Sequence, residues 1–502
     1  MSEFFLELFS EEIPAKLQIN ARKQIKEIFK NFFHDNEIII KSDINSFSTP
    51  NRLIVYVDKL PKEIVKKSEE VRGPSVNAPE QALEGFLKSN NIIKKKIYKK
   101  KTEKGDFYFY KKPSQKIRTF ELLKKNIQNL LLKISWEKSM RWGSYNLYWG
   151  RPLKSILAIF DKKVLEFSLG HIDSSNKTFI DKDLEQNAKN FVDFKSYNKY
   201  FIQAGIILDQ EKRKSFIRNE VNKLANNKKF KVNLNDKLLE ELTNIVEKPK
   251  ILICEFDKRF LNIPKEILII TMQAHQKYFP TFDKKDKITN NFLVVADIKD
   301  LKGLVKTGNE RVVEARLSDA EFFWNRNKSQ NLVKEISKLK NVNYFKGLGS
   351  YFDKIQRMRK LSAMISDEFL ISKEKIEIAS SICKVDLMSD LVSEFPELQG
   401  VMGGYFADAQ GFEKEVCQAI SEHYLPIGMD SKVPKKPYSI ALSLSDKIDS
   451  LVGFFGINLI PSSSKDPYAL RRMSISLVRL VLENRINIKI RDLINYSCML
   501  YK

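Results

Sequence analysis

The pattern of apolar residues changes character at about residue 310, and this change constrains the fold more than any other feature of the chain. Before it, short apolar or β-branched runs alternate with helical repeats, whereas after it helical periodicity continues to the end. Runs with helical spacing cover 310–326, 351–373, 375–394, 412–424, 437–455 and 466–485. The sequence therefore predicts a multi-domain α+β protein with a mixed α/β N-terminal half and an all-helical C-terminal region.

The first part of the chain is predicted to form strand, helix and strand. Phe4–Phe9 is a short apolar run, and Pro14 suits the first turn of a helix because it lacks an N–H group. The stretch 52–57 is rich in β-branched residues. A Gly-containing turn predicts a hairpin across 91–112.

Chain length sets the expected number of domains. At roughly 100–200 residues per domain, 502 residues suggest three or four. We expect an α/β region at 1–150, a second mixed α/β module at 151–310 and the all-helical domain at 311–502.

The chain is strongly basic, with 87 Lys and Arg against 63 Asp and Glu and a formal net charge of +24. Such an excess favours polyanionic partners, which are nucleic acid or an anionic membrane surface. The abundance of Lys, Asn and Ile also fits the compositional drift of an AT-rich genome. No stretch approaches the ~20 apolar residues that span a bilayer, and the 4 cysteines form no CxxC pair. We expect a soluble cytoplasmic protein without a membrane partner.

Self-contained catalysis is not supported by the residues. The phosphate-binding pattern GxxxxGK[ST] does not occur, and the histidines share no metal-ligand spacing. His34-Asp35 stands at the end of a predicted helix, where the helix dipole alone favours a histidine. We therefore predict no catalytic residue and no metal ligand in this chain.

The long C-terminal helices could still build the core of a metal-dependent phosphohydrolase. The candidate ligands are Asp386, Asp390, His423, Asp446 and Asp449. One histidine among several carboxylates is a poor set for hydrolytic metals. We interpret the carboxylates as helix-surface groups or as structural hydrogen-bond acceptors.

A basic segment near the end of the chain is a better candidate for phosphate contacts. Ser464 or Asp466 can cap a helix that begins with Pro467 and carries Arg471 and Arg472 about a turn in. Helix N-termini and arginine forks both suit phosphate. A structural Arg–carboxylate pair between helices explains the same arginines equally well.

Two further basic segments have open interpretations. The lysines of 94–101 could neutralise phosphates, but an edge strand that lysine protects against aggregation is the better explanation. In 308–324, Arg311 and Arg316 are interleaved with a predicted buried stripe of Val312, Ala315, Ala320 and Phe323. This pattern predicts a helix held between domains by ion pairs, and a functional and a scaffold role are equally supported.

These segments, in this order, resemble the beta subunit of bacterial heterotetrameric glycyl-tRNA synthetase along nearly the whole chain. Similar motifs between residues 4 and 324 are FFLELFSEEIPAK at 4–16, TPNRL at 49–53, MRWG at 140–143, TMQAHQKYFP at 271–280 and GNERVVEARLSDAEFFW at 308–324. The helical part has EFPELQG at 394–400, EHYLP at 422–426 and KDPYALRR at 465–472. So many ordered matches, several of them long, make the resemblance specific.

The chain departs from the family pattern at a few positions. Asn51 stands where an arginine is common, and Ser463-Ser464 replaces a Thr-Gly-Ser-like turn. The stretch SNKTF at 175–179 replaces a Gly-His-Arg-Phe-like stretch, which puts any contact of that His or Arg in doubt. Family members usually continue into a helical anticodon-binding domain, and we expect this C-terminal domain to be absent from the chain that ends at Lys502.

The resemblance implies a ligase subunit that binds tRNA-Gly and supports a catalytic alpha subunit in an α2β2 complex. The alpha subunit would use ATP and Mg to activate glycine, so we expect no cofactor in this chain and no activity of the chain alone. Region 1–150 would handle tRNA, and the helical region would be a degenerate relative of the HD-type phosphohydrolases.

We expect tRNA contacts from the basic residues of the two matching motifs, which are Arg311, Arg316, Lys465, Arg471 and Arg472. Two alternatives stay open at this point. One is a diverged metal-dependent HD-type phosphohydrolase, and the other is a purely structural scaffold for the alpha subunit.

Overall fold

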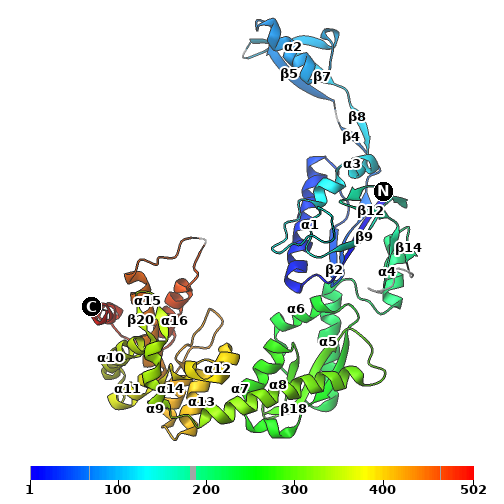
Figure 1. Ribbon diagram of the computed structural model, residues 1–502. Coiled ribbons are helices and arrows are strands. Elements are labelled where there is room, and N and C mark those ends of the chain that lie inside the picture. The colour runs from blue at the N-terminus through cyan, green and yellow to red at the C-terminus, as the bar shows by residue number, and fades with distance from the viewer. Residues whose placement is uncertain (1, 67, 104, 181–187, 464, 502) are drawn as a thin grey trace. The chain divides into compact units, whose positions relative to one another are not determined.

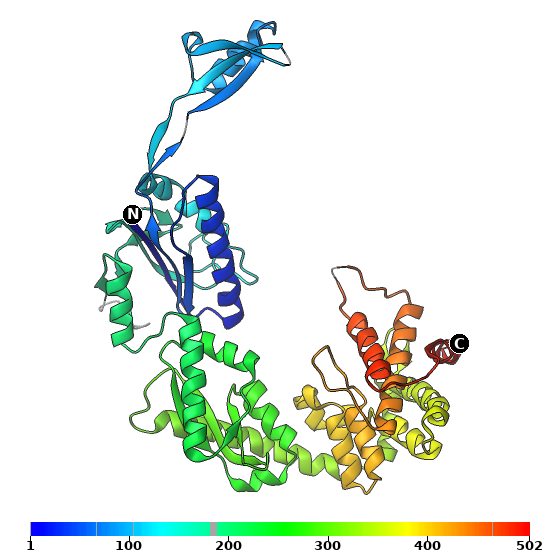
Figure 2. The ribbon, with the colours of Figure 1, turned by 180° about the vertical axis from the view of Figure 1, so that it is seen from behind.

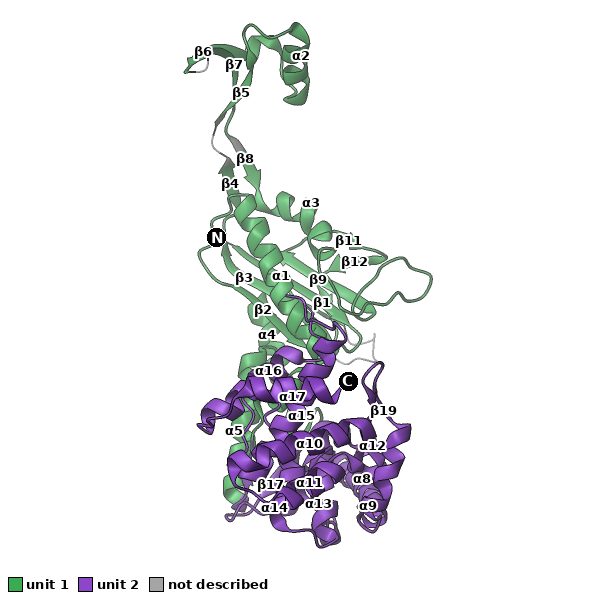
Figure 3. Ribbon diagram, turned by 90° about the vertical axis from the view of Figure 1, so that its left-hand side faces the viewer, with its two compact units in different colours: residues 1–227, 234–252, 295–300 green, residues 228–233, 253–294, 301–502 purple. Residues whose placement is uncertain are grey.

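The computed structural model describes residues 2–66, 68–103, 105–180, 188–463 and 465–501 (Figure 1). Its contacts divide the chain into two compact units, shown in green and purple in Figure 3. Unit 1 comprises 1–227, 234–252 and 295–300, and unit 2 comprises 228–233, 253–294 and 301–502. The mixed α+β class is confirmed, and the finer division at residues 150 and 310 stays a prediction.

The main sheet of unit 1 is built around the apolar strand that begins the chain. Its order is β11-β12-β9-β1-β3-β2, with β10 paired to β9. The strands are β1 (Ser2–Ser10), β2 (Ile44–Thr49), β3 (Arg52–Leu60), β9 (Leu153–Phe160), β10 (Lys163–Val164), β11 (Ser168–Leu169) and β12 (Ile172–Ser175). β1 pairs antiparallel with β3 and β9, so Phe4 lies opposite both Val57 and Phe160. The strands predicted at the start of the chain are confirmed.

Helices cover both faces of this sheet, as Figures 1 and 2 show. On one face, α1 (Ala15–Asp35) and α3 (Thr119–Leu131) contribute Phe29 and Ile127 to a core with Phe4. On the other face, α4 (Phe194–Gln203) contributes Tyr197, which packs beside Phe5. The alternation of side chains along β1 therefore supplies two cores, one on each face.

An inserted module, residues 63–118, lies between β3 and α3 in the sequence. β4 (Glu63–Lys66) pairs with β8 (Gln115–Arg118). Between them, β5 (Glu69–Ser75), β6 (Ile97–Thr102) and β7 (Gly105–Lys112) form a sheet of order β5-β7-β6 with α2 (Glu80–Ser89) and a 3₁₀ turn at Lys94–Lys96. The predicted hairpin is confirmed, because β6 and β7 pair antiparallel across the turn.

The middle of the chain forms a second, smaller sheet of order β15-β17-β18-β16. Its strands are β15 (Lys231–Val232), β16 (Lys250–Glu255), β17 (Phe279–Phe282) and β18 (Ile288–Ala296). Further elements of this stretch are β13 (Lys177–Thr178), β14 (Lys189–Asn190), α5 (Gln210–Lys228), α6 (Asp236–Ile245), a 3₁₀ turn at Lys258–Asn262, α7 (Lys265–Ile270) and a π-helix at Thr271–His275.

The remainder of unit 2 is mainly helical. It contains α8 (Leu304–Lys328), α9 (Leu332–Glu335), α10 (Tyr351–Phe369), α11 (Lys373–Ile382), α12 (Asp390–Glu394), α13 (Val401–Ala409), α14 (Lys414–Glu422), α15 (Pro437–Gly456), α16 (Leu470–Glu483) and α17 (Ile490–Leu500). Three 3₁₀ turns lie at Ile336–Asn341, Val385–Met388 and Pro396–Leu398. Among the described residues, no helix combines the length and the apolar character needed to cross a bilayer.

Two expectations for the helical region were wrong in detail. The region is not entirely helical, because β19 (Asn343–Phe345) and β20 (Gly349–Ser350) form a short hairpin. The helix predicted across 375–394 breaks after Ile382, where Ser389 caps a separate α12 by accepting the backbone N–H of Val392. A serine that offers its hydroxyl to the backbone competes with helix continuation.

Helix α15 is the centre of this region. Twelve consecutive residues, 439–450, are buried, including Asp446, Lys447 and Asp449. Helices α10, α11, α14, α16 and α17 all contact it. A helix buried on every side must find partners inside the protein for each charged residue it carries.

Candidate functional site

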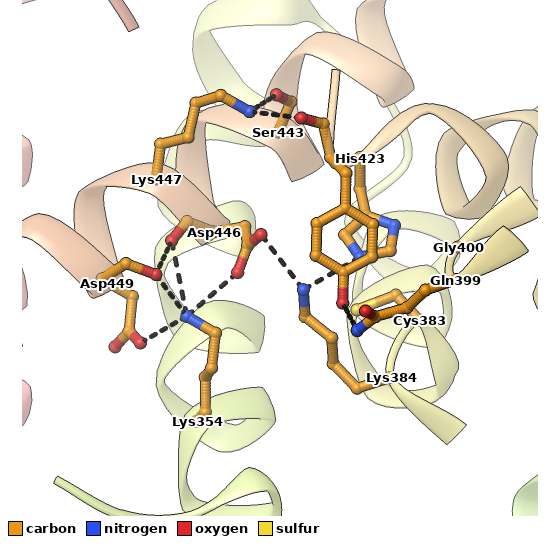
Figure 4. A network of polar contacts seen from close by, with 12 residues as sticks. Lys354, Cys383, Lys384, Gln399, Gly400, His423, Ser443, Asp446, Lys447 and Asp449 are labelled. Atoms are coloured by element: carbon orange, nitrogen blue, oxygen red, sulfur yellow. Dashed lines mark hydrogen bonds and ion pairs between the residues drawn. The ribbon is translucent and has the colours of Figure 1, made fainter. Parts of the chain in front are cut away.

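The two aspartates of α15 belong to a buried ionic centre, which we define as Lys354, Arg357, Lys384, His423, Asp446 and Asp449. Figure 4 shows its members apart from Arg357. Asp446 lies between two ammonium groups, with Lys354 Nζ at 2.9 Å and Lys384 Nζ at 3.0 Å. Lys384 Nζ also lies 2.9 Å from His423 Nε2. Asp449 Oδ1 accepts from Arg357 Nε at 2.6 Å.

Helical spacing explains how these groups meet. Asp446 and Asp449 are three residues apart on α15, and Lys354 and Arg357 are three apart on α10. Residues at that spacing share one face of a helix, so two carboxylates meet two cations where α10 packs on α15. Ser450, one residue beyond Asp449, accepts a hydrogen bond from Lys354 at 2.7 Å.

The electrostatics of the ionic centre favour a charged Lys354, an ionised Asp446 and a neutral imidazole. Burial alone would raise the pKa of Asp446, but Lys354 and Lys384 hold that pKa well below its usual range. Burial and the neighbouring Lys384 lower the pKa of His423 well below its usual value. The neutral ring therefore accepts from Lys384 through Nε2, and its Nδ1–H donates to the Ile420 carbonyl at 2.6 Å.

The donor set resembles the ligands of a divalent metal, but its carboxylate and imidazole are already paired with lysines. The Asp446 carboxylate and the His423 nitrogen both contact the Lys384 ammonium, and Lys354 approaches Asp446 from the other side. The positive charges next to the Asp446 carboxylate are therefore the ammonium groups of two lysines. Within the described residues, no group of three or more His, Cys, Asp or Glu side chains is placed to hold a metal ion.

The interpretation of the five candidate ligands needs a correction. Asp386, Asp446 and Asp449 are buried, so describing them as helix-surface groups was wrong, whereas their role as structural hydrogen-bond acceptors is confirmed. Asp386 Oδ2 accepts the backbone N–H groups of Gly400 and Gly403 at 2.5 and 3.2 Å. Burial raises the pKa of Asp386 to about 6.

Asp390 is the surface member of the five. It is only partly buried and lies 3.4 Å from Arg326.

A pocket of about 380 Å³ adjoins the ionic centre. Asp446 and Lys447 line it from α15, Arg472 from α16, and Gln399 and Tyr424 from the preceding turns. The Tyr424 hydroxyl accepts from Gln399, and the Lys384 ammonium lies 3.7 Å from the centre of its ring. The polar residues on this side of the pocket are therefore largely paired with other protein groups.

The helix that carries the predicted C-terminal cations begins later than expected. α16 starts at Leu470, not Pro467, because Ala469 adopts a left-handed φ of 56°. Asp466 nevertheless caps it, accepting the N–H groups of Leu470 and Arg471 at 2.9 and 3.0 Å. Ser464, the other predicted cap, lies outside the described residues.

The two adjacent arginines of α16 have different surroundings. Arg471 donates to the backbone carbonyls of Pro461, Ser462 and Ser463, so it orders the preceding loop rather than pairing with a carboxylate. Arg472 is exposed at the pocket. Lys465 is exposed as well, and the described residues provide neither Lys465 nor Arg472 with a side-chain partner.

The cations of α8 also differ from each other. Arg316 lies 3.4 Å from Glu394 of α12, an exposed ion pair of the kind the scaffold interpretation requires. Arg311 is exposed, and no ion pair of its side chain occurs within the described part of the chain. The buried stripe consists of Val313, Leu317 and Ala320, so the expectation for Val312 and Ala315, which are exposed, was wrong. No described contact joins these arginines to those of α16.

Sequence reasoning missed a buried arginine in unit 1. Arg52 is fully buried, with Glu247 at 2.8 Å and Glu7 at 3.3 Å. Its guanidinium also lies over the rings of Phe9 and Phe201. The available signal was a pair of opposite charges next to apolar runs: Glu7 lies within the run Phe4–Phe9, and Arg52 directly precedes the run 53–57.

These features define a class of protein: a large basic α+β chain in which buried carboxylates and a histidine of the helical region are paired with lysines. The family model of the glycyl-tRNA synthetase beta subunit matches residues 4–502. The chain belongs to this family.

Relatives with the same family name cover the whole chain. The glycine–tRNA ligase beta subunits of Rickettsia typhi and Rickettsia felis are each 38% identical to it, over 503 and 504 residues. The corresponding protein of Rickettsia prowazekii is 37% identical over 503 residues. In each case the alignment spans 100% of this chain and 75% of the relative.

Proposed function

We propose that this chain binds tRNA-Gly and supports a separate catalytic alpha subunit in the ATP-dependent ligation of glycine to tRNA. Membership of the beta-subunit family carries the proposal. The ionic centre supports the division of labour, because its carboxylates and histidine are occupied by lysines. Activation of glycine, with its ATP and Mg, is assigned to the alpha subunit.

The proposed complex is an α2β2 tetramer in the cytoplasm. The relatives are named as beta subunits of glycine–tRNA ligase, and a beta subunit requires a partner to complete the ligase. The strongly positive charge suits the polyanionic substrate of that complex.

The proposed tRNA contacts are Arg311, Arg316, Lys465, Arg471 and Arg472. Exposure and the lack of a carboxylate partner in the described structure favour Arg311, Lys465 and Arg472. The loop partners of the Arg471 side chain are neutral carbonyls, so they do not compensate its charge. The argument for a tRNA contact is weakest for Arg316, because Glu394 already compensates the charge of its side chain.

We also infer that the helical region is a degenerate HD-type phosphohydrolase core. His423 directly after α14, Asp386 in the turn 385–388 and two aspartates of α15 are all buried in this region, and Asp446 also lines the pocket, which favours that ancestry. An active, diverged phosphohydrolase is the second candidate function. Lys354 and Lys384 weigh against it, because a metal would have to displace both ammonium groups.

The test is reconstitution with the alpha partner. Mixing the two chains should give a complex with the mass of an α2β2 tetramer that charges tRNA-Gly, whereas either the absence of tRNA binding or charging by the beta chain alone would contradict the proposal. A complex that forms and charges although the beta chain makes no RNA contact would instead support the scaffold alternative.

A further inference from the structure

The inserted module holds a disproportionate share of the positive charge. Residues 63–118 contain fifteen Lys and Arg against seven Asp and Glu, so this ninth of the chain carries +8 of the net +24. Protection of edge strands explains lysines on β6, one of the two outer strands of the β5-β7-β6 sheet. It does not explain the aromatic rings of β6 and β7 that accompany the cations.

The strand register sorts these side chains onto two faces. Arg72 lies opposite Phe109, Tyr98 opposite Phe109, and Lys100 opposite Phe107. Because directly opposed residues share a face of a sheet, these five lie on one face. Lys99 and Lys101, opposite Tyr108 and Asp106, lie on the other.

The face formed by Arg72, Tyr98, Lys100, Phe107 and Phe109, here the stacking face, has an ordered arrangement of rings and cations. The Arg72 guanidinium lies 3.6 Å from the centre of the Phe107 ring. Tyr98 stacks on Phe109 at 6.2 Å with an interplanar angle of 27°, and Lys100 lies 5.4 Å from the same ring.

Glu70 holds two members of the stacking face in place. It accepts from the Tyr98 hydroxyl at 2.6 Å and forms an ion pair with Lys100. Arg72, Tyr98 and Lys100 are nevertheless exposed. A planar guanidinium and a tyrosine ring are thus open to solvent on one side and supported by phenylalanine on the other.

We propose that the stacking face binds an unpaired segment of RNA, and that in the ligase complex this RNA is tRNA. The tRNA part of the inference rests on the proposed function. Unpaired bases stack on aromatic rings and on arginine planes, and neighbouring cations neutralise the backbone phosphates. An acidic protein would also be attracted by the positive charge of the module, but it would not need the exposed planar groups of Arg72 and Tyr98, on which bases can stack.

The experiment compares two variants of the full chain that lose the same number of cations from the same sheet. The stacking-face variant is Arg72→Ala/Tyr98→Ala/Lys100→Ala, and the control is Lys99→Ala/Lys101→Ala on the opposite face. The probes are a tRNA-Gly transcript, a short single-stranded uridine RNA and a duplex RNA of the same length. Far-UV circular dichroism checks that both variants fold.

We expect the Kd for tRNA and for the single strand to rise about tenfold in the stacking-face variant, and less than about threefold in the control. Duplex RNA should respond similarly to both variants. A single substitution, Arg72→Lys, keeps the charge but removes the plane, so it should weaken single-strand binding without changing the salt dependence.

The outcomes separate this inference from the proposed function. Equal losses in the two variants, or unchanged binding in the stacking-face variant, would overturn the inference while tRNA binding by the wild-type chain stands. Failure of the wild-type chain to bind tRNA would contradict the proposed function. Binding of the single-stranded RNA, compared between the two variants, would then still test whether the stacking face binds unpaired RNA.

Discussion

Lys354 and Lys384 occupy equivalent-looking positions beside Asp446, yet their energetics differ. Burial would lower the pKa of Lys354, but Asp446, together with Asp449, raises it well above its usual value. The pKa of Lys384 is lowered, because burial outweighs the attraction of Asp446. The folded structure therefore favours the charged form of Lys354 and disfavours the charged form of Lys384.

The replacement of Lys354 tests this difference. Lys354→Met leaves Asp449 with Arg357 alone and Asp446 with one lysine, so it should lower the free energy of unfolding by about 3–5 kcal/mol. Lys384→Met should lower the free energy of unfolding by a smaller amount. Urea unfolding followed by circular dichroism measures both. The matched control is Lys375→Met, whose exposed pair with Glu413 should leave stability close to wild type; equal effects of all three would contradict the assignment.

Lys447 makes the stability of the helical region depend on pH. Burial lowers its pKa to about 7, with Asp446 opposing and Lys384 and Lys354 reinforcing the shift. Its ammonium donates to the carbonyls of Tyr424 and Leu425 and to Ser443. Above about pH 7 the folded lysine loses its proton, while the unfolded one keeps it up to about pH 10.4.

The sign of the effect follows from proton uptake. Between about pH 7 and pH 10 the unfolded chain binds more protons, so this group makes stability rise with pH by up to about 1.4 kcal/mol per unit. Urea midpoints of wild type and Lys447→Met, measured at several pH values in this window, give the difference. We expect the wild type to gain relative to the variant as pH rises; parallel curves would show that Lys447 stays protonated in the fold.

At the level of single elements, the spacing of apolar residues predicted which segments form strands and helices. The strands at 4–9 and 52–57 and the helix that follows Pro14 are present because their apolar spacing decides which face is buried. The start of α16 was missed because one residue, Ala469, turns left-handed, and no apolar pattern signals such a turn.

The ionic centre could not be predicted from the sequence, because its partners are distant. Arg357 and Asp449 are 92 positions apart, and a charged residue on a helix is normally solvated. The sequence did indicate that the carboxylates act as structural hydrogen-bond acceptors, and the contacts of Asp386 and Asp449 confirm this. Which carboxylates are buried, and that lysines neutralise them, depends on the packing of α10 against α15.

Helix α16 allows a test of tRNA contact by its N-terminal arginines. Each phosphate contact adds about −0.9 to the slope of log K against log salt for duplex nucleic acid. Arg471→Ala/Arg472→Ala should therefore weaken tRNA binding and flatten the slope by up to about two units. The control is Arg359→Ala, because that exposed arginine is paired with Glu377 at 3.0 Å. A slope unchanged by the double replacement would return both arginines to a structural role.

For the whole molecule, the question is whether the helical region only supports a ligase or also performs chemistry. A phosphohydrolase needs metal ions that polarise a phosphate and generate hydroxide. In this chain the corresponding carboxylates have lysine partners at 2.9 and 3.0 Å, and the neutral histidine accepts from one of the same lysines. Expelling both ammonium groups would leave buried charges without partners, which is strongly unfavourable.

Metal removal therefore distinguishes the two functions in the intact chain. We expect the purified protein to contain less than stoichiometric divalent metal. EDTA should leave its thermal midpoint unchanged, because lysine side chains, which EDTA cannot remove, supply the positive charge next to Asp446. Added Mn²⁺ should release no phosphate from nucleotides. A stoichiometric metal whose chelation lowers the midpoint, and which is lost when His423 is replaced by Ala, would favour the phosphohydrolase. Such a metal can bind His423 Nε2 only if the Lys384 ammonium leaves it.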